Sequence, residues 1–513
     1  MIQNATPRIF LYEIKLETFC DSNGSNFGDF NGLLSKRDYL KDLNINVLAI
    51  NDILNHYQNK FELQEIKKRY GSVSNFVSCV QKFRESNIEI APIIDISKIK
   101  QSYINLNNML DLYELSNDNK NAKKLTALDT YIVNDNDKNT SLDVLSNLIK
   151  YLSKVVSFYA QCKIKTIVIS NFDFLIDRNN LDEANKFQFL QDVYRIIKRI
   201  NVDITIILKN SHFKKTIFNK MLKLEQTCFD YLYLNFLSNN QLTNNFRKAK
   251  LQKFNFNIFI KEYKPFINDK RIILAVGADH LGRINSRWGN ELGYIYESAK
   301  TFLMILFAAH NSVGIYYGDE LGILRAKVRK TYDFNNENYN EEKRFYQANN
   351  ISNEEYFRAQ SFQNKWSSYT WMPWDEMSGI SRSNENRNSL ILSPIKLNIT
   401  NVDYQLKTQS SPLFFLKQLY EFVFNSNYAK LLDDSRLKVS SCKDGIVKVQ
   451  HKISDNVTIL FVVNLTSKHL AFKRDDEYKI ILSTYHNKFY SSVPNNLCPY
   501  ESLILIKENE NNA

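Results

Sequence analysis

A short loop near the N-terminus places oxygen-bearing residues at alternate positions. Its pattern is Asp21-x-Asn23-x-Ser25-x-Phe27-x-Asp29. Oxygen ligands with this spacing on a tight, glycine-containing loop suit a hard cation such as Ca²⁺. Two interpretations stay open: the loop is a calcium site, or its side chains close Asx turns and it holds no metal.

The chain is basic, but its charges are not clustered. Its 513 residues include 67 Lys+Arg and 55 Asp+Glu, which gives a net charge of +12 and a sequence pI near 9.1. The basic residues are interleaved with acids, which is typical of a solvated surface, so nucleic acid is not an expected partner. With 44% hydrophobic residues there is material for a large core, and global disorder is excluded.

The sequence predicts a cytoplasmic protein without a membrane span. No apolar run approaches the roughly 18–20 residues that a bilayer requires, and the best candidate, Phe302 to Ala309, is much shorter. The first residues lack a basic segment followed by an apolar one, so no secretory signal is expected. The six cysteines are far apart and form no Cys-x-x-Cys pair, which favours reduced thiols.

Short apolar runs alternate with stretches of helical period along most of the chain. Strands are expected at Arg8–Leu16, Asn46–Asp52, Glu89–Asp95, Lys165–Phe172, Asp203–Lys209, Phe229–Phe236, Lys270–Gly277 and Val313–Gly318. Apolar strands that alternate with helices indicate a parallel sheet buried on both faces. Eight such units predict an α/β fold, a (β/α)8 TIM barrel whose active site lies at the C-terminal ends of the strands.

Two segments depart from this alternation. Residues 100–140 are polar and irregular, and they predict a shortened insertion domain after the third strand. From about Asp444 strands follow one another without helices, which indicates a C-terminal antiparallel β-sandwich. The expected domains are a barrel over 1–99 and 141–436, the insertion over 100–140, and the sandwich over 437–513.

Several segments resemble one known family. They are FCDSNGSNFGDFNGLLSKRDYLKDLNINVLAI at 19–50, SRWGN at 286–290, IYYGDELGI at 315–323 and WMPWDEMSGIS at 371–381. In this order they are similar to the α-amylase-type glycoside hydrolases (family 13), in the branch of oligo-1,6-glucosidases and α-glucosidases. The resemblance implies the barrel fold and a calcium loop in which Ser25 replaces an aspartate ligand, so that the site is weakened.

The resemblance does not extend to the catalytic residues. A retaining glycosidase uses a carboxylate nucleophile and a second carboxyl group as acid/base. Alignment with the family pattern places Ser170 at the nucleophile, Val168 at its neighbouring arginine and Lys209 at the acid/base. A shifted register could bring Asp173 forward as nucleophile, but it would supply neither the arginine nor the acid/base.

The remaining pocket positions of the family are also changed. The last acid of an Asn-His-Asp motif becomes His280, preceded by Asp279, and a histidine after the third strand becomes Lys100. The tyrosine on the first strand becomes Lys15, and the aspartate after the second becomes Glu62. Together these replacements predict that the chain does not hydrolyse glycosides.

The basic residues at these changed positions indicate what the pocket would bind in place of a glycoside substrate. In the family pattern Lys15, Lys100 and Lys209 face the pocket, and Arg283 and Arg287 follow the seventh strand. Such a pocket would attract an anionic small molecule. The alternative is that these lysines point to solvent or pair with acids such as Asp279 and Glu62.

The sequence thus favours a pseudo-glycosidase, a catalytically degenerate homologue kept for binding or scaffolding. Two alternatives remain: an enzyme with a new activity on an anionic substrate, and an active α-glucosidase whose catalytic residues are misaligned. Carbohydrate, an anionic small molecule or a protein are the candidate partners, and calcium is the only candidate cofactor.

Overall fold

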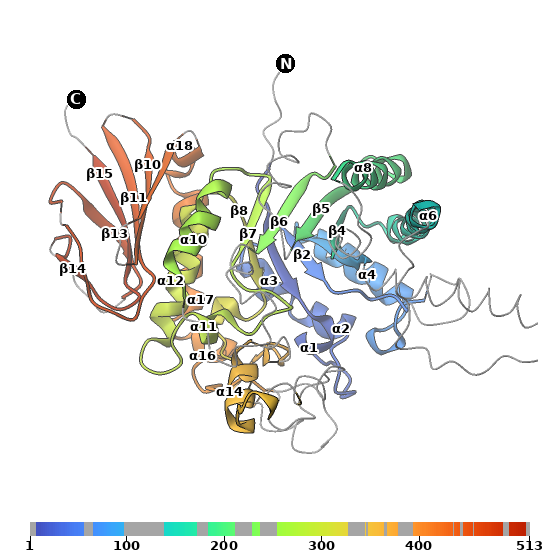
Figure 1. Ribbon diagram of the computed structural model, residues 1–513, viewed down its shortest axis with the longest axis horizontal. Helices are drawn as coiled ribbons and strands as arrows, with labels where there is room; N and C mark the ends of the chain where they lie inside the picture. Colours follow the sequence, from blue (N-terminus) through green and yellow to red (C-terminus); the bar gives the residue numbers. More distant parts are fainter. Residues whose placement is uncertain are drawn as a thin grey trace, which may run out of the picture. The chain divides into compact units, whose positions relative to one another are not determined.

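A computed structural model describes most of the chain in two compact units, residues 49–232 and residues 1–48 with 233–513 (Figure 1). The described residues are 7–55, 65–96, 138–171, 183–210, 228–235, 254–326, 344, 347–363, 367–377, 393–433, 435–441, 445–454, 456–473, 475–485 and 492–508. The expected insertion lies outside them, apart from its last residues, where the helix α6 begins at Lys138.

Eight parallel strands form a closed barrel in the order of the sequence. They are β1 (Phe10–Ile14), β2 (Val47–Ile50), β3 (Glu89–Asp95), β4 (Thr166–Ser170), β5 (Thr205–Asn210), β6 (Tyr231–Asn235), β7 (Ile272–Ala275) and β8 (Ser312–Tyr316). All residues of β1, β2, β4, β6, β7 and β8 are buried, as expected for strands covered on both faces. The predicted fold is confirmed.

Amphipathic helices cover the strands of the unit formed by residues 49–232. Its helices are α4 (Val73–Arg84), α6 (Lys138–Gln161), α8 (Glu183–Ile200) and the short η1 (Lys68–Tyr70). The start of α4 is fixed by a capping box, in which the Ser72 side chain accepts from the Asn75 amide and the Asn75 side chain accepts from the Ser72 amide. The strands β3, β4 and β5 then lie in register beside one another.

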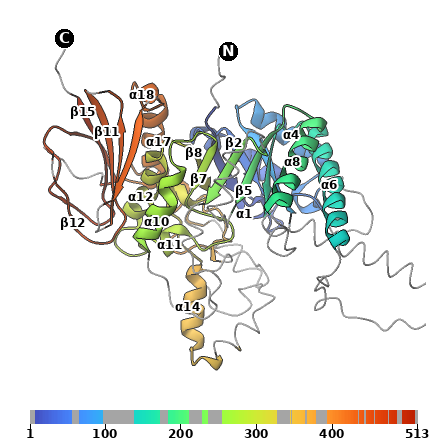
Figure 2. The same ribbon diagram turned by 45° about the horizontal axis from the view of Figure 1, so that its top comes forward.

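The other unit contains the remaining helices. They are α1 (Leu16–Phe19), α2 (Phe30–Ser35), α3 (Arg37–Asp42), α10 (Phe256–Tyr263), η2 (Lys264–Phe266), α11 (Ile284–Arg287), α12 (Ile295–Ala308), η3 (Asp319–Leu321), α14 (Asn353–Gln363), α16 (Val402–Leu406), α17 (Pro412–Tyr420), η6 (Glu421–Asn425) and α18 (Ala429–Asp433). Helix α12 is buried at almost every position because it packs on α17 and on the C-terminal sheet (Figure 2). Thr301 on α12 donates to the Tyr500 carbonyl and shares a hydrogen bond with Ser502.

The C-terminal domain is antiparallel, as predicted. Its main sheet has the order β13-β15-β11-β10-β9, and β12 pairs with β14. The strands are β9 (Arg436–Ser441), β10 (Ile446–Lys452), β11 (Val457–Asn464), β12 (Leu470–Ala471), β13 (Lys479–Ser483), β14 (Asn496–Leu497) and β15 (Ser502–Glu508). The sequence did not predict β9, β12 or β14, because β9 is rich in charged and polar residues and the other two contain only two residues each.

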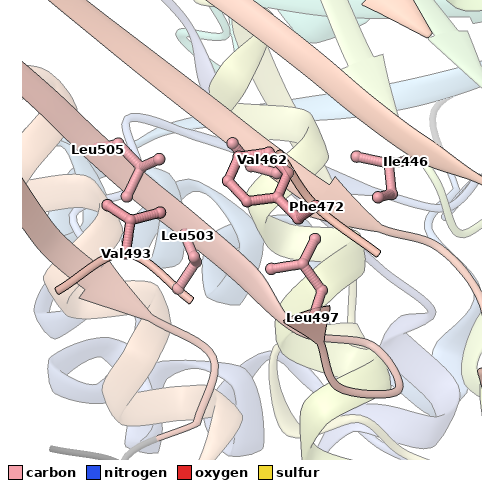
Figure 3. Packing of buried hydrophobic residues seen from close by; sticks show 7 residues of the cluster. All are labelled: Ile446, Val462, Phe472, Val493, Leu497, Leu503 and Leu505. Atoms are coloured by element: carbon pink, nitrogen blue, oxygen red, sulfur yellow. The ribbon is translucent and has the colours of Figure 1, made fainter. Parts of the chain in front are cut away.

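An apolar cluster holds this domain together on the face of the sheet that bears Ile446. Figure 3 shows its seven buried members. They are Ile446, Val462, Phe472, Val493, Leu497, Leu503 and Leu505.

No described helix is long and apolar enough to cross a membrane.

Candidate functional site

The ends of three neighbouring strands bring together Ser170 and Lys209, the two residues that the sequence alignment predicts at the catalytic positions. In the register of the sheet, Asp95 on β3 pairs with Ser170 on β4, and Ser170 pairs with Lys209 on β5. In-register residues of parallel strands point to the same face. Ser170 and Lys209 are 6% and 7% exposed, so both are buried. This register places a serine and a lysine next to each other at the C-terminal ends of β4 and β5.

In the other unit, Lys15 is held by an acid. It lies between β1 and α1, and its Nζ is 2.9 Å from Oδ2 of Asp279, which follows β7. The two side chains are 20% and 26% exposed. Burial lowers the pKa of Lys15, but the charges of Asp279, Glu17 and Glu13 outweigh this effect and raise the pKa above its ordinary value. The positive charge of Lys15 is therefore balanced by Asp279, as expected under the ion-pair alternative.

His280 lies beside the same carboxylate. Its Nδ1 is 3.4 Å from Oδ1 of Asp279, a long contact whose donor depends on the ring tautomer. The Asp279 carboxylate is thus approached by Lys15 at one oxygen and by His280 at the other. Asp279 is therefore shared between two of the predicted site residues.

Arg283 is a buried structural residue. It is 1% exposed, and its guanidinium stacks on the rings of Tyr316 and Tyr317, 5.1 Å and 4.7 Å from their centroids. The same group donates to the Tyr317 carbonyl and to the Thr370 hydroxyl, and lies 3.9 Å from Asp319 Oδ1. These contacts hold the end of β8 to the segment that follows the barrel.

A second arginine near Asp319 is less well satisfied. Arg287 Nε donates to the Gly282 carbonyl, but its two terminal nitrogens and Asp319 Oδ2 have no hydrogen-bond partner among the described residues. Burial lowers the pKa of Arg287 to about 10 and raises the pKa of Asp319 to about 7. A Cβ on Gly277 would lie 1.7 Å from Asp319 Oδ2, so a larger residue at this position would displace the Asp319 side chain.

A buried carboxylate links β1 and α3 to the turn that follows β8. Glu320 is 0% exposed; its Oε1 accepts from the hydroxyls of Tyr12 (2.5 Å) and Tyr39 (2.7 Å), and its Oε2 accepts from the Gly318 amide. Burial raises the pKa of Glu320, against the lowering effect of these hydrogen bonds. Sequence reasoning noted the segment 315–323 only as a signature and missed this network. The apolar context of Glu320 is the signal that could have revealed it.

The loop with alternating oxygen groups is closed by its own hydrogen bonds. Asp21 accepts from the amides of Asn23, Gly24 and Asn26, and Asp29 accepts from Ser22 and the Gly32 amide. Asn23 Oδ1 accepts from the Ser25 amide, and the Ser25 hydroxyl donates to the Phe27 carbonyl. The side-chain atoms of this loop that could bind a metal are oxygens, which suit Ca²⁺. The carboxylate oxygens keep lone pairs that a cation could use. No group of three or more His, Cys, Asp or Glu with metal-site geometry occurs among the described residues.

Two predicted site residues, Glu62 and Lys100, lie outside the described residues. The structure therefore brings Lys15, Asp279 and His280 together in one unit, and pairs Ser170 with Lys209 in the other.

Comparison with known proteins identifies the barrel. The family model described as the α-amylase catalytic domain matches residues 14–97 and 142–428. The chain belongs to the α-amylase family. Members of this family are glycoside hydrolases, and the match covers the barrel from the end of β1 through β8 but not the C-terminal strands β9–β15.

Curated relatives in the α-amylase family match shorter stretches. Alpha-amylase 3 of Dictyoglomus thermophilum is 36% identical over 89 residues, or 17% of each chain. The oligo-1,6-glucosidase of Heyndrickxia coagulans is 25% identical over 234 residues, which are 44% of this chain and 40% of that protein. The matches thus span less than half of these relatives.

Solved structures agree in fold over nearly the whole length. The trehalose-6-phosphate hydrolase of Bacillus licheniformis has a TM-score of 0.76 at 16% identity and covers 98% of this chain and 100% of its own. The isomaltulose synthase of Klebsiella sp. LX3 has a TM-score of 0.74 at 15% identity and covers 97% and 98%. At this identity the likeness shows the α-amylase-family fold alone.

Proposed function

We propose that this α-amylase-family protein is a pseudo-glycosidase, an α-glucosidase-like member that has lost hydrolysis and is retained for ligand binding or scaffolding. The observation that carries the proposal is the register of Ser170 beside Lys209 at the ends of β4 and β5. A retaining glycosidase needs two carboxyl groups about 5 Å apart at these positions. A serine and a lysine supply neither the glycosyl-enzyme bond nor the carboxylic acid.

The environment of Lys15 supports the same proposal. Its ammonium group is engaged by Asp279, so both members of the pair are occupied with each other. Asp279 is then not available to bind a sugar hydroxyl as a free carboxylate. The ion pair also argues against Lys15 as an anion-binding group, which weakens the alternative of a new enzyme acting on an anionic substrate.

The direct test is hydrolysis by the full chain. Turnover of 4-nitrophenyl α-glucoside, maltose and isomaltose should not exceed the background of the matched variants Ser170→Ala and Lys209→Met. Loss of the carboxylate pair costs many orders of magnitude in rate, so any contaminating activity should be the same in all three proteins. Turnover that falls in either variant, or that is abolished by Asp173→Asn, would refute the proposal.

A binding screen then identifies the retained role. Thermal-shift measurements with neutral sugars, sugar phosphates and nucleotides compare the ligand classes that the pocket could accept. We expect a shift with a neutral carbohydrate if the pocket still binds sugars, and none with any class if the protein acts as a scaffold. A shift confined to sugar phosphates, together with turnover, would favour the new-enzyme alternative.

A further inference from the structure

The face of the C-terminal sheet that bears Ile446 is divided into two halves. Paired residues of antiparallel strands point to the same side of a sheet. Ile446 on β10, the pair Val462–Leu503, and Leu505 therefore share one face, and Phe472, Val493 and Leu497 pack over it (Figure 3). This half is the apolar core of the domain.

The other half of the same face is basic. Lys448, Gln450 and Lys452 continue β10 on this side, and their partners on β9 are Ser440, Lys438 and Arg436. We call Arg436, Lys438, Lys448 and Lys452 the basic strip. Arg436, Lys438 and Lys452 are exposed, and Lys448 is partly buried with its ammonium 4.6 Å from the centroid of the Phe472 ring.

Among the residues that the structure describes, no acid is paired with the strip in the sheet ladders of β9, β10 and β11. The residues that pair with it on β11 are Val462, Leu460 and Thr458, which carry no charge. Beyond them, Lys507 on β15 pairs with Thr458 and forms an ion pair with Glu477. Arg436 and Lys438 form no ion pair in the part of the chain that the structure describes, so their charges are left for a partner.

The spacing of the basic strip indicates the kind of surface that such a partner presents. Lys448 and Lys452 are four residues apart on one strand, about 13 Å, and the step from β10 to β9 is about 4.8 Å. The cations stand on one face of the sheet, on two neighbouring strands. Ser440 and Gln450 lie between the cations and carry no aromatic ring, and the ring of Phe472 beside Lys448 is buried, so these residues offer no exposed ring for stacking against nucleic-acid bases.

We propose that the basic strip docks the protein on an anionic lipid surface. Three of the four basic side chains are exposed, and cations distributed along one sheet face suit a layer of mobile anionic headgroups better than one shaped molecule. This inference goes beyond the proposed function, and it holds whether or not the barrel hydrolyses glycosides.

The test is flotation of the full chain with vesicles. We expect binding to vesicles of phosphatidylcholine with 30% phosphatidylserine at low salt, loss of binding at 0.5 M NaCl, and none to phosphatidylcholine alone. Each basic residue near such a surface contributes about fivefold in affinity. The variant R436Q/K438Q/K448Q/K452Q should therefore bind at least tenfold more weakly.

A control variant removes the same charge elsewhere. Lys407, Lys430, Lys468 and Lys479 are exposed, and Lys479 faces the opposite side of the same sheet, paired with Ile506. K407Q/K430Q/K468Q/K479Q should bind like the unmodified protein, and both variants should keep its melting temperature within a few degrees. The proposal fails if the unmodified protein does not bind, if both variants lose affinity equally, or if the strip variant loses binding to single-stranded DNA but not to vesicles.

Discussion

Breaking the ion pair between Lys15 and Asp279 should destabilise the protein through the group that is left behind. The side chains are about three-quarters buried, since they are 20% and 26% exposed. Removing one partner of a fully buried pair costs about 3–5 kcal/mol, while exposed pairs contribute about 0–1 kcal/mol. For this intermediate burial we expect about 2 kcal/mol for Lys15→Met, which leaves the Asp279 carboxylate without its closest cation.

A double-mutant cycle isolates the pairwise energy. Asp279→Asn should cost less than Lys15→Met, because Lys15 keeps the attraction of Glu17 and Glu13. The double variant should be more stable than the sum of the single effects implies, with a coupling of about 1–2 kcal/mol.

Urea unfolding of the four proteins, followed by intrinsic fluorescence, measures these differences. The prediction requires parallel slopes, so that only the midpoints change. Additive effects within about 0.5 kcal/mol would refute the reasoning, because they would mean that the two charges do not interact in the folded protein.

Two further predictions concern buried acids and calcium. The raised pKa of Asp319, about 7, means that the folded state retains a proton that the unfolded state loses above about pH 4. Its contribution to stability therefore falls as pH rises from 4 to 7. The melting temperature of Asp319→Asn relative to the unmodified protein should rise across this range, and a constant difference would contradict this. For the oxygen-rich loop, we expect Ca²⁺ added after EDTA to raise the melting temperature, and Ser25→Asp to strengthen the effect by restoring a charge. No shift in either protein would leave the loop as a set of Asx turns.

Much of the barrel could be predicted from local sequence. The expected third strand, Glu89–Asp95, matches β3 residue for residue, and the other seven barrel strands differ by a few residues at their ends. Runs of apolar residues specify strands buried on both faces whatever their neighbours are, and this is why the alternation was sufficient. Strand ends depend on where the hydrogen-bond ladder stops, which local composition does not encode.

The family pattern also predicted where several site residues lie on the strands. It placed Ser170 and Lys209 at the ends of the fourth and fifth strands, and the sheet pairs these residues directly. That Ser170 and Lys209 replace the catalytic carboxyl groups stays a prediction, which the hydrolysis assay tests. The same pattern gave the loop from Asp21 to Asp29, but not the hydrogen bonds that close it.

Only the tertiary structure decided how the charges are paired. The sequence left open whether Lys15 attracts an anion or meets an acid, and its partner Asp279 is 264 residues away. Glu320 is likewise satisfied by Tyr12 and Tyr39, from the first strand and a helix near the N-terminus. The basic strip could not be predicted because β9 is rich in charged and polar residues, and its alignment with β10 exists only in the folded sheet. Periodicity records which face of an element is buried, whereas the partner of a charged group is set by barrel closure and strand register, which join residues far apart in the chain.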